Sequence, residues 1–129
     1  MNSDSSERLQ RFIRERQRQN ARILDSGHLG VRRFFNLDEA AYRDGALEPK
    51  TKEMLGLVAS LVLRCNDCVD YHLIQCVELG ANEDELIEVL NVGLIVGGSI
   101  VIPHLRHAFD NLDVLLAERA AQKSGDTGS

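Results

Sequence analysis

The sequence predicts an all-helical protein, and three observations support that prediction. Apolar residues recur at helical spacing along much of the chain, and no segment shows the alternation of apolar and polar residues that is typical of strands. Only 2 Pro interrupt the pattern. The length of 129 residues suits one domain, residues 1–129, built as a bundle of about six helices around a single core.

The first half of the chain predicts three helices separated by short turns. A helix over about residues 5–25 is expected to form an N-terminal helical arm, residues 1–30. A second helix is expected over about residues 31–43. A third is expected over about residues 49–63, because Pro49 suits the first position of a helix.

The second half predicts three more helices, which glycines separate. Asn82 with Glu85 three residues later is a capping-box pattern, and it predicts where the second of these helices begins. The Gly- and Ser-rich tail, residues 122–129, is expected to be disordered. The three helices are expected from the cysteine pair to about Leu79, from Asn82 to about Gly97, and from about Ile100 to Ala120.

Composition and charge argue against several classes of function. The net charge is -5, and the arginine-rich first helix has acidic residues interspersed and one aromatic residue, Phe12, so no nucleic-acid partner is expected. The polar residues 1–6 do not resemble a secretion signal, which predicts a cytoplasmic protein. The longest apolar tract, residues 92–102, is about half of the ~20 residues that a membrane span needs. No membrane role is expected.

Residues 86–102 are apolar on nearly every side of the predicted helix. A six-helix monomer of this size has too little other surface to cover such a segment. We therefore expect a homo-oligomer that buries part of it between subunits.

The residues with the clearest chemical meaning are Cys65, Cys68 and His72. If Cys65 begins a helix, the i,i+3 and i,i+4 steps place all three on one helical face. The helix N-terminus and an imidazole favour a thiolate, the imidazole can move a proton, and the two sulfurs can close a disulfide. This pattern is typical of two-electron thiol chemistry. Glu53, in the preceding predicted helix, could reach the thiols or could equally lie on the surface.

Other interpretations of these residues stay open at this stage. The two cysteines could be small buried thiols, or Cys65, Cys68 and His72 could bind zinc with His104 or His107 as the fourth ligand. Most other candidates are expected to have structural roles: Cys76 in the core, His28 in a turn, His104 and His107 in solvent or capping positions, Gly97–Gly98 at a bend, and Asp67 and Asp70 in the first helical turn.

Several tracts together resemble the AhpD-like, or carboxymuconolactone decarboxylase, superfamily over about residues 46–116. They are residues 47–53, the Cys65–His72 pattern, residues 78–81, Val96-Gly97-Gly98 and His104. For an alkylhydroperoxidase of this kind, the resemblance implies an all-α core, Cys68 as the peroxide-attacking thiol, Cys65 as the resolving thiol, and Glu53 and His72 as a proton relay. It also implies a homotrimer or homohexamer and a hydroperoxide or other small-molecule substrate. The implied reductant is a dithiol, lipoyl-bearing in the best-known branch, and no cofactor or metal is implied.

The chain departs from that branch at Asp67, where histidine often precedes the second cysteine. A carboxylate there opposes thiolate formation by like charge. The alternative function is a cofactor-free lyase of the carboxymuconolactone decarboxylase type. Its anionic substrate would need a cation in the pocket, for which the sequence offers Arg64 and Arg106.

Overall fold

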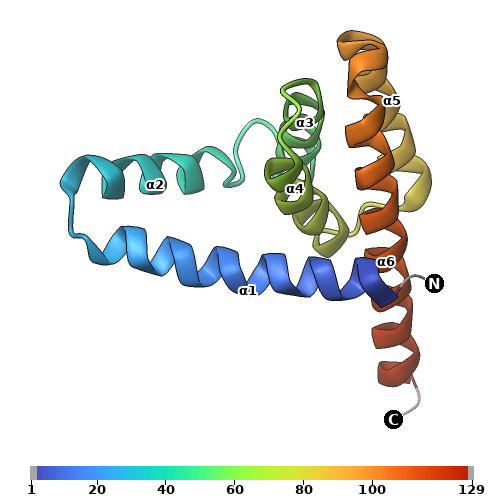
Figure 1. Cartoon of the computed structure of the whole chain (residues 1–129), viewed down its shortest axis with the longest axis horizontal. Helices are drawn as coiled ribbons and strands as arrows, with labels where there is room; N and C mark the ends of the chain where they lie inside the picture. The colour runs from blue at the N-terminus through green and yellow to red at the C-terminus, as the bar shows by residue number, and fades with distance from the viewer. Residues whose placement is uncertain (1–2, 128–129) are drawn as a thin grey trace.

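A computed structural model describes residues 3–127 and confirms the all-helical prediction. Its elements are α1 (Ser3–Asp25), α2 (Leu29–Ala41), α3 (Pro49–Val62), α4 (Asn66–Glu78), α5 (Glu83–Gly97), the single 3-10 turn η1 (Ser99–Val101) and α6 (Ile102–Thr127). Figure 1 shows α3 to α6 gathered into one bundle, from which α1 and α2 extend to one side. No strand occurs within the described range.

Local sequence signals account for where the central helices begin. Pro49 occupies the first turn of α3, where its missing N–H costs no hydrogen bond. The predicted capping box of α5 is present, because the Asn82 side chain accepts from the Glu85 N–H and the Glu85 carboxylate accepts from the Asn82 N–H. Cys65 is the N-cap residue of α4, and its sulfur accepts a hydrogen bond from the backbone N–H of Cys68.

Helices α3 and α4 end in the same backbone motif. After α3, the N–H of Cys65 donates to the Ser60 carbonyl and that of Arg64 to the Leu61 carbonyl, which is the Schellman pattern. In each motif one residue adopts a positive φ. This residue is Arg64 after α3, with φ of 60°, and Gly80 after α4, with φ of 91°. A side chain in this left-handed region costs about 1–2 kcal/mol. The motif brings Cys65 directly from the end of one helix to the N-cap of the next.

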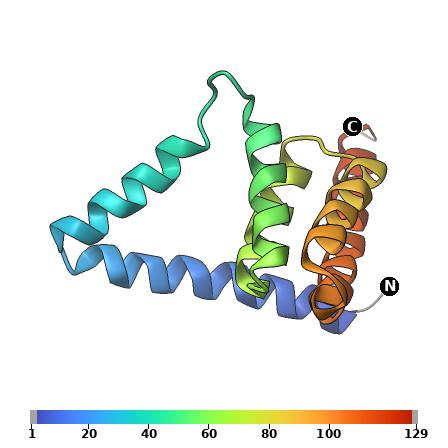
Figure 2. The ribbon, with the colours of Figure 1, turned by 90° about the horizontal axis from the view of Figure 1, so that it is seen from above.

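The hydrophobic core lies between α3, α4, α5 and α6, with one residue from α1. Figure 2 shows α5 and α6 side by side on one flank of α3 and α4. Gly93 on α5 lets the Leu61 side chain approach closely, since a Cβ there would lie 2.7 Å from Leu61 Cδ2. Completely buried core residues include Leu57, Leu61, Val69, Leu73, Cys76, Ala81, Leu86, Leu90, Val101 and Ala108.

The arm of the molecule is longer than the sequence predicts, since it includes α2 as well as α1. The start of α1 packs on α6 and buries Leu9, whereas no residue of α2 is buried. Figure 1 shows α1 passing below α3 and α4 and meeting α6 partway along its length, and Figures 1 and 2 show α2 returning at an angle from the turn after α1. The arm thus stands beside α3 and α4 and encloses the space next to α4.

The C-terminal helix differs from the expected disordered tail. Helix α6 continues to Thr127, and residues 128–129 lie outside the described range. Once a helix exists, each added residue needs no new nucleation, so a polar sequence can extend it.

None of the helices in the described range is long and apolar enough to cross a membrane.

Candidate active site

The structure brings Cys65 and Cys68 together as a disulfide, with their Cα atoms 5.3 Å apart. Cys65 is half-buried at the N-cap of α4, and Cys68 is exposed in its first turn. The free N–H groups at this end of the helix favour a thiolate, because they carry partial positive charge. Cys68 is the more exposed residue of the pair and the one that lines a pocket, so it is the cysteine that a reactant can approach from solvent.

His72 lies one turn farther along α4 and is held by a buried carboxylate. Its Nδ1 is 2.7 Å from Oε1 of Glu53 on α3, and Glu53 is only 5% exposed. Because a carboxylate can only accept, Nδ1–H donates to Glu53. Within the described range no group hydrogen-bonds the other ring nitrogen, Nε2. The position of Glu53, which the sequence left open, is thus on the inner face of α3.

Gly56 provides the space that this histidine needs. A Cβ on Gly56 would lie 2.7 to 2.9 Å from three atoms of the His72 ring. Gly56 follows Glu53 by one helical turn, so the carboxylate and the gap lie on the same face of α3. The ring therefore packs directly on the backbone of α3 while its Nδ1 reaches Glu53.

Two tyrosines flank the His72 ring. The ring centroid of Tyr42 lies 5.3 Å away and that of Tyr71 lies 5.2 Å away in an edge-on arrangement. Burial raises the pKa of both tyrosine hydroxyls, and the negative charge of Glu53 raises it further. The Arg16 guanidinium of α1 lies 4.0 Å from the centroid of the Tyr71 ring, a cation–π contact that fixes the arm against α4.

A pocket of about 450 Å³ lies over Cys68. Helix α4 provides Cys68, His72, Tyr71 and Asp67, and the arm provides the opposite wall with Phe12, Glu15, Arg16, Gln19, Asn20 and Asp38. Glu53 does not line this pocket but a neighbouring one of about 460 Å³. The Glu53–His72 pair therefore connects the two spaces. Sequence reasoning had no signal for Arg16, because its place in the pocket depends on how the arm folds back.

Cys76, expected in the core, is buried, and its sulfur forms no disulfide. Burial, with the Glu53 charge as a smaller cause, raises the pKa of its thiol from 9.0 to about 12. At neutral pH it is protonated and inaccessible, unlike the dithiol at the other end of α4.

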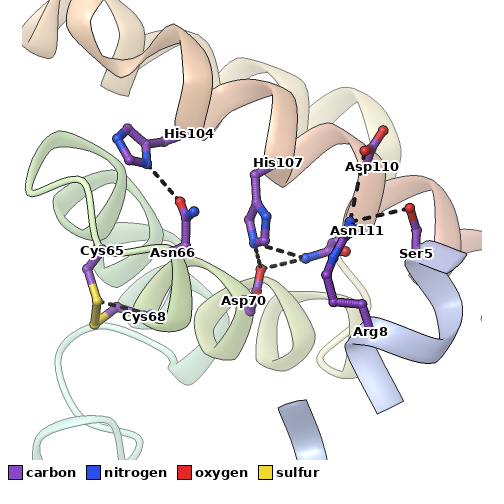
Figure 3. Close-up of polar contacts among 10 residues, drawn as sticks. All are labelled: Ser5, Arg8, Cys65, Asn66, Cys68, Asp70, His104, His107, Asp110 and Asn111. Carbon is purple, nitrogen blue, oxygen red and sulfur yellow. Dashed lines mark hydrogen bonds and ion pairs between the residues drawn. A yellow bond between two sulfur atoms is a disulfide. The ribbon is translucent and has the colours of Figure 1, made fainter. Parts of the chain in front are cut away.

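A second polar network occupies another side of α4, and Figure 3 shows it. Asp70 Oδ1 accepts from Nε2 of His107 at 2.8 Å and from the Asn111 amide at 2.6 Å. His104 Nδ1 donates to Asn66 Oδ1 at 2.8 Å. The prediction that Asp70 is a first-turn acid is wrong, because its carboxylate is buried against α6. The spacing of His104, His107 and Asn111 on one face of α6 was the available signal.

The geometry does not favour the zinc interpretation. Within residues 3–127 no group of three or more His, Cys, Asp or Glu side chains is placed to hold one metal ion. His104 and His107 are engaged by Asn66 and Asp70 on a side of α4 away from the cysteines. What the arrangement can do is exchange two electrons at a dithiol and move a proton through His72 and Glu53.

Comparison with known sequences finds a family model and two relatives, each matching about two thirds of the chain. The family model for the carboxymuconolactone decarboxylase family matches residues 30–111. An uncharacterized protein of Cupriavidus necator, H16_B0147, is 30% identical over 84 residues, which cover 65% of this chain and 74% of that protein. Uncharacterized protein 4 in the cox locus of Paracoccus denitrificans is 25% identical over 80 residues, 62% of this chain and 72% of that protein.

Solved structures of proteins with related sequences have the same fold. One crystal structure of TM1620 from Thermotoga maritima has a TM-score of 0.84 at 51% identity, over 86% of this chain and 97% of that one. A second crystal structure of the same protein has a TM-score of 0.80 at 50% identity, over 92% of this chain and 98% of that one. It is described as a carboxymuconolactone decarboxylase family protein for which a part in the antioxidative response is suggested. The family protein lpg0406 from Legionella pneumophila has a TM-score of 0.72 at 27% identity, over 85% of this chain and 96% of that one. This chain belongs to the carboxymuconolactone decarboxylase family.

Proposed function

We propose that this protein is a thiol-dependent peroxidase and disulfide oxidoreductase of the alkylhydroperoxidase type, acting in the cytoplasm. Cys68 is the peroxide-attacking thiol and Cys65 the resolving thiol. Glu53 and His72 form the proton relay. The observation that carries the proposal is the closed Cys65–Cys68 disulfide whose exposed sulfur shares a pocket with a histidine held by a buried carboxylate.

The reaction begins with the reduced dithiol. The Cys68 thiolate attacks the terminal peroxide oxygen, the O–O bond breaks, and the alkoxide takes a proton that His72 supplies. Cys68 is then a sulfenic acid. The sulfur of Cys65 attacks the sulfur of Cys68, and a disulfide forms with loss of water. A dithiol reductant, a lipoyl-bearing protein being one candidate, returns two electrons and two protons to the pair.

The Cys68→Ser variant tests this assignment. It should consume no hydroperoxide above the rate of buffer, because the attacking sulfur is gone, whereas Cys76→Ser should keep its rate because that thiol is buried. Consumption is followed with tert-butyl hydroperoxide and a small dithiol, and mass spectrometry locates the Cys65–Cys68 bridge after one equivalent of oxidant. Unchanged turnover in Cys68→Ser would refute the proposal.

The family also suggests the lyase alternative, and one observation bears on it. Neither Arg64 nor Arg106 lines the pocket, but Arg16 does, and a guanidinium can hold a carboxylate. A lyase that uses His72 and acidic groups would keep its activity when both cysteines are replaced. A lactone decarboxylation assay of the Cys65→Ser, Cys68→Ser double variant therefore separates the two functions.

We also propose that the chain assembles as a homotrimer or homohexamer. The predicted interface segment keeps large apolar side chains in solvent, among them Ile95 at 76% and Val96 at 67% exposure. Exposed apolar area of this kind marks a protein–protein contact. Light scattering should give three or six times the 14.4 kDa chain mass, and Ile95→Glu should reduce it. A monomeric mass for the parent chain would contradict this.

A further inference from the structure

Acidic side chains outnumber basic ones around the pocket over Cys68. Glu15, Asp38 and Asp67 line it, and Arg16 is the one Lys or Arg among its lining residues. The three carboxylates come from three different helices, α1, α2 and α4. They therefore lie on both walls of the pocket, Glu15 and Asp38 on the arm and Asp67 on α4.

Among residues 3–127, two of these three carboxylates form no ion pair, and the lining keeps an acidic excess even when the charge of Arg16 is counted. Glu15 is paired with Arg18 at 2.6 Å, and Arg16 lies over the Tyr71 ring. Within the described range neither Asp38 nor Asp67 takes part in an ion pair. The charge of Asp38 is felt inside the site, since it contributes to the raised pKa of Tyr42 and Tyr71 after burial and Glu53.

The apolar part of the wall is aromatic. Phe12 from the arm and Tyr71 from α4 both line the pocket, so an apolar or aromatic portion of a reactant finds contact area there. The sulfur, the aromatic walls and the two carboxylates thus face the same volume.

We propose that Asp38 and Asp67 make this pocket selective for uncharged or cationic hydroperoxides and disulfides and select against reactants that carry carboxylates. The inference rests on the proposed function, because the same dithiol is the reacting group. It also opposes the lyase alternative, whose substrate is anionic.

The size of the effect follows from Coulomb's law. A unit charge about 7 Å from a carboxylate in water changes its local concentration about threefold. The two carboxylates together give about tenfold for each sign of reactant charge, so an unscreened cation and anion at this distance would differ about 80-fold. Salt screening lowers this ratio, and we expect a cation and an anion to differ at least about tenfold at low ionic strength through these two residues.

Three symmetric disulfides of different charge provide the test. The reduced protein is mixed with cystamine, bis(2-hydroxyethyl) disulfide or 3,3′-dithiodipropionate, which are dicationic, neutral and dianionic. The Cys68 thiolate attacks one sulfur and expels one thiolate; Cys65 then attacks Cys68 and expels the second, so the protein is oxidised as the reagent is reduced. Acid quench, alkylation and mass spectrometry give the rates.

The measured quantity is the ratio of the cystamine rate to the dithiodipropionate rate. It should fall at least about tenfold from the parent to Asp38→Asn, Asp67→Asn at low salt, and the fall should shrink at 0.5 M salt, an ionic strength at which the Debye length is about 4 Å. The reagents' own reactivities and any change in thiolate fraction cancel in this comparison. Arg16→Gln should move the ratio in the opposite direction.

The matched control is Asp84→Asn, Asp113→Asn, which changes the net charge equally at exposed positions that do not line the pocket. Its ratio should equal that of the parent. An unchanged ratio in the pocket variant, or an equal fall in the control, overturns the inference. Loss of tert-butyl hydroperoxide turnover with the ratio intact would refute only the proposed peroxidase. Failure of all three reagents to oxidise the dithiol would refute both.

Discussion

Helix α4 carries two histidine–carboxylate contacts on different sides, and their surroundings differ. Glu53 and His72 meet at 2.7 Å, and Asp70 and His107 at 2.8 Å, with both carboxylates about 5% exposed. His72 lines a pocket with an exposed sulfur, whereas Asp70 is also bonded to buried Asn111. The same pair of groups thus faces a pocket in one place and joins two helices in the other. We propose that this difference in access to a reactant makes Glu53–His72 the pair that takes part in catalysis.

The largest expected effect is on stability, and it concerns the packing pair. Asp70→Ala removes the acceptor shared by His107 and Asn111 and leaves their donors unpaired in the interior. We expect a loss of about 3 kcal/mol in the free energy of unfolding. Urea denaturation measures it. At a temperature where the variant is folded, its peroxide turnover should stay within about threefold of the parent.

The opposite result is expected for the pocket pair. Glu53→Gln keeps the shape and one hydrogen bond to His72 but removes the proton acceptor. Peroxide turnover should fall about 100-fold, the usual contribution of a positioned acid or base, while the free energy of unfolding changes by less than about 1 kcal/mol. Steady-state kinetics and urea denaturation together check this. If Glu53→Gln lost stability and kept turnover, the two pairs would have been assigned in reverse.

The third and smallest effect concerns Gly56, which leaves the space that the His72 ring occupies on α3. Gly56→Ala would push a Cβ against the His72 ring and lengthen its bond to Glu53. We expect turnover to fall about tenfold, or about 1.4 kcal/mol in the barrier. Gly93→Ala is the matched control, because its Cβ would approach Leu61 equally closely, away from the pocket. It should lower stability and leave the rate of the folded protein unchanged.

Some features of the site could be predicted because they depend on one helix alone. The spacing of Cys65, Cys68 and His72 determines which residues share a face of α4. Asn82 with Glu85 likewise predicts a cap whose partners lie three residues apart. The catalytic roles of Glu53, Cys65, Cys68 and His72 stay predictions.

Other features could not be predicted from periodicity. Asp70 follows Cys68 closely and looks like a residue of the opening turn, yet its partners lie on α6. Arg16 looks like one of many solvated arginines, yet it lies over Tyr71 beside the pocket. In both cases the partner is distant in sequence. The spacing on α6 marks a polar face but does not identify Asp70 as its partner, and no local spacing indicates Arg16.

The sequence by itself determined the all-helical class, the capping box of α5 and the alignment of two sulfurs and an imidazole, because hydrogen bonds and side-chain spacing within a helix are local. Only the tertiary structure decided that Glu53 faces His72, that α6 holds the other side of α4, and that the arm forms the acidic wall over Cys68. Those arrangements depend on which helices pack together, and packing is selected by the burial of the whole core rather than by any one segment.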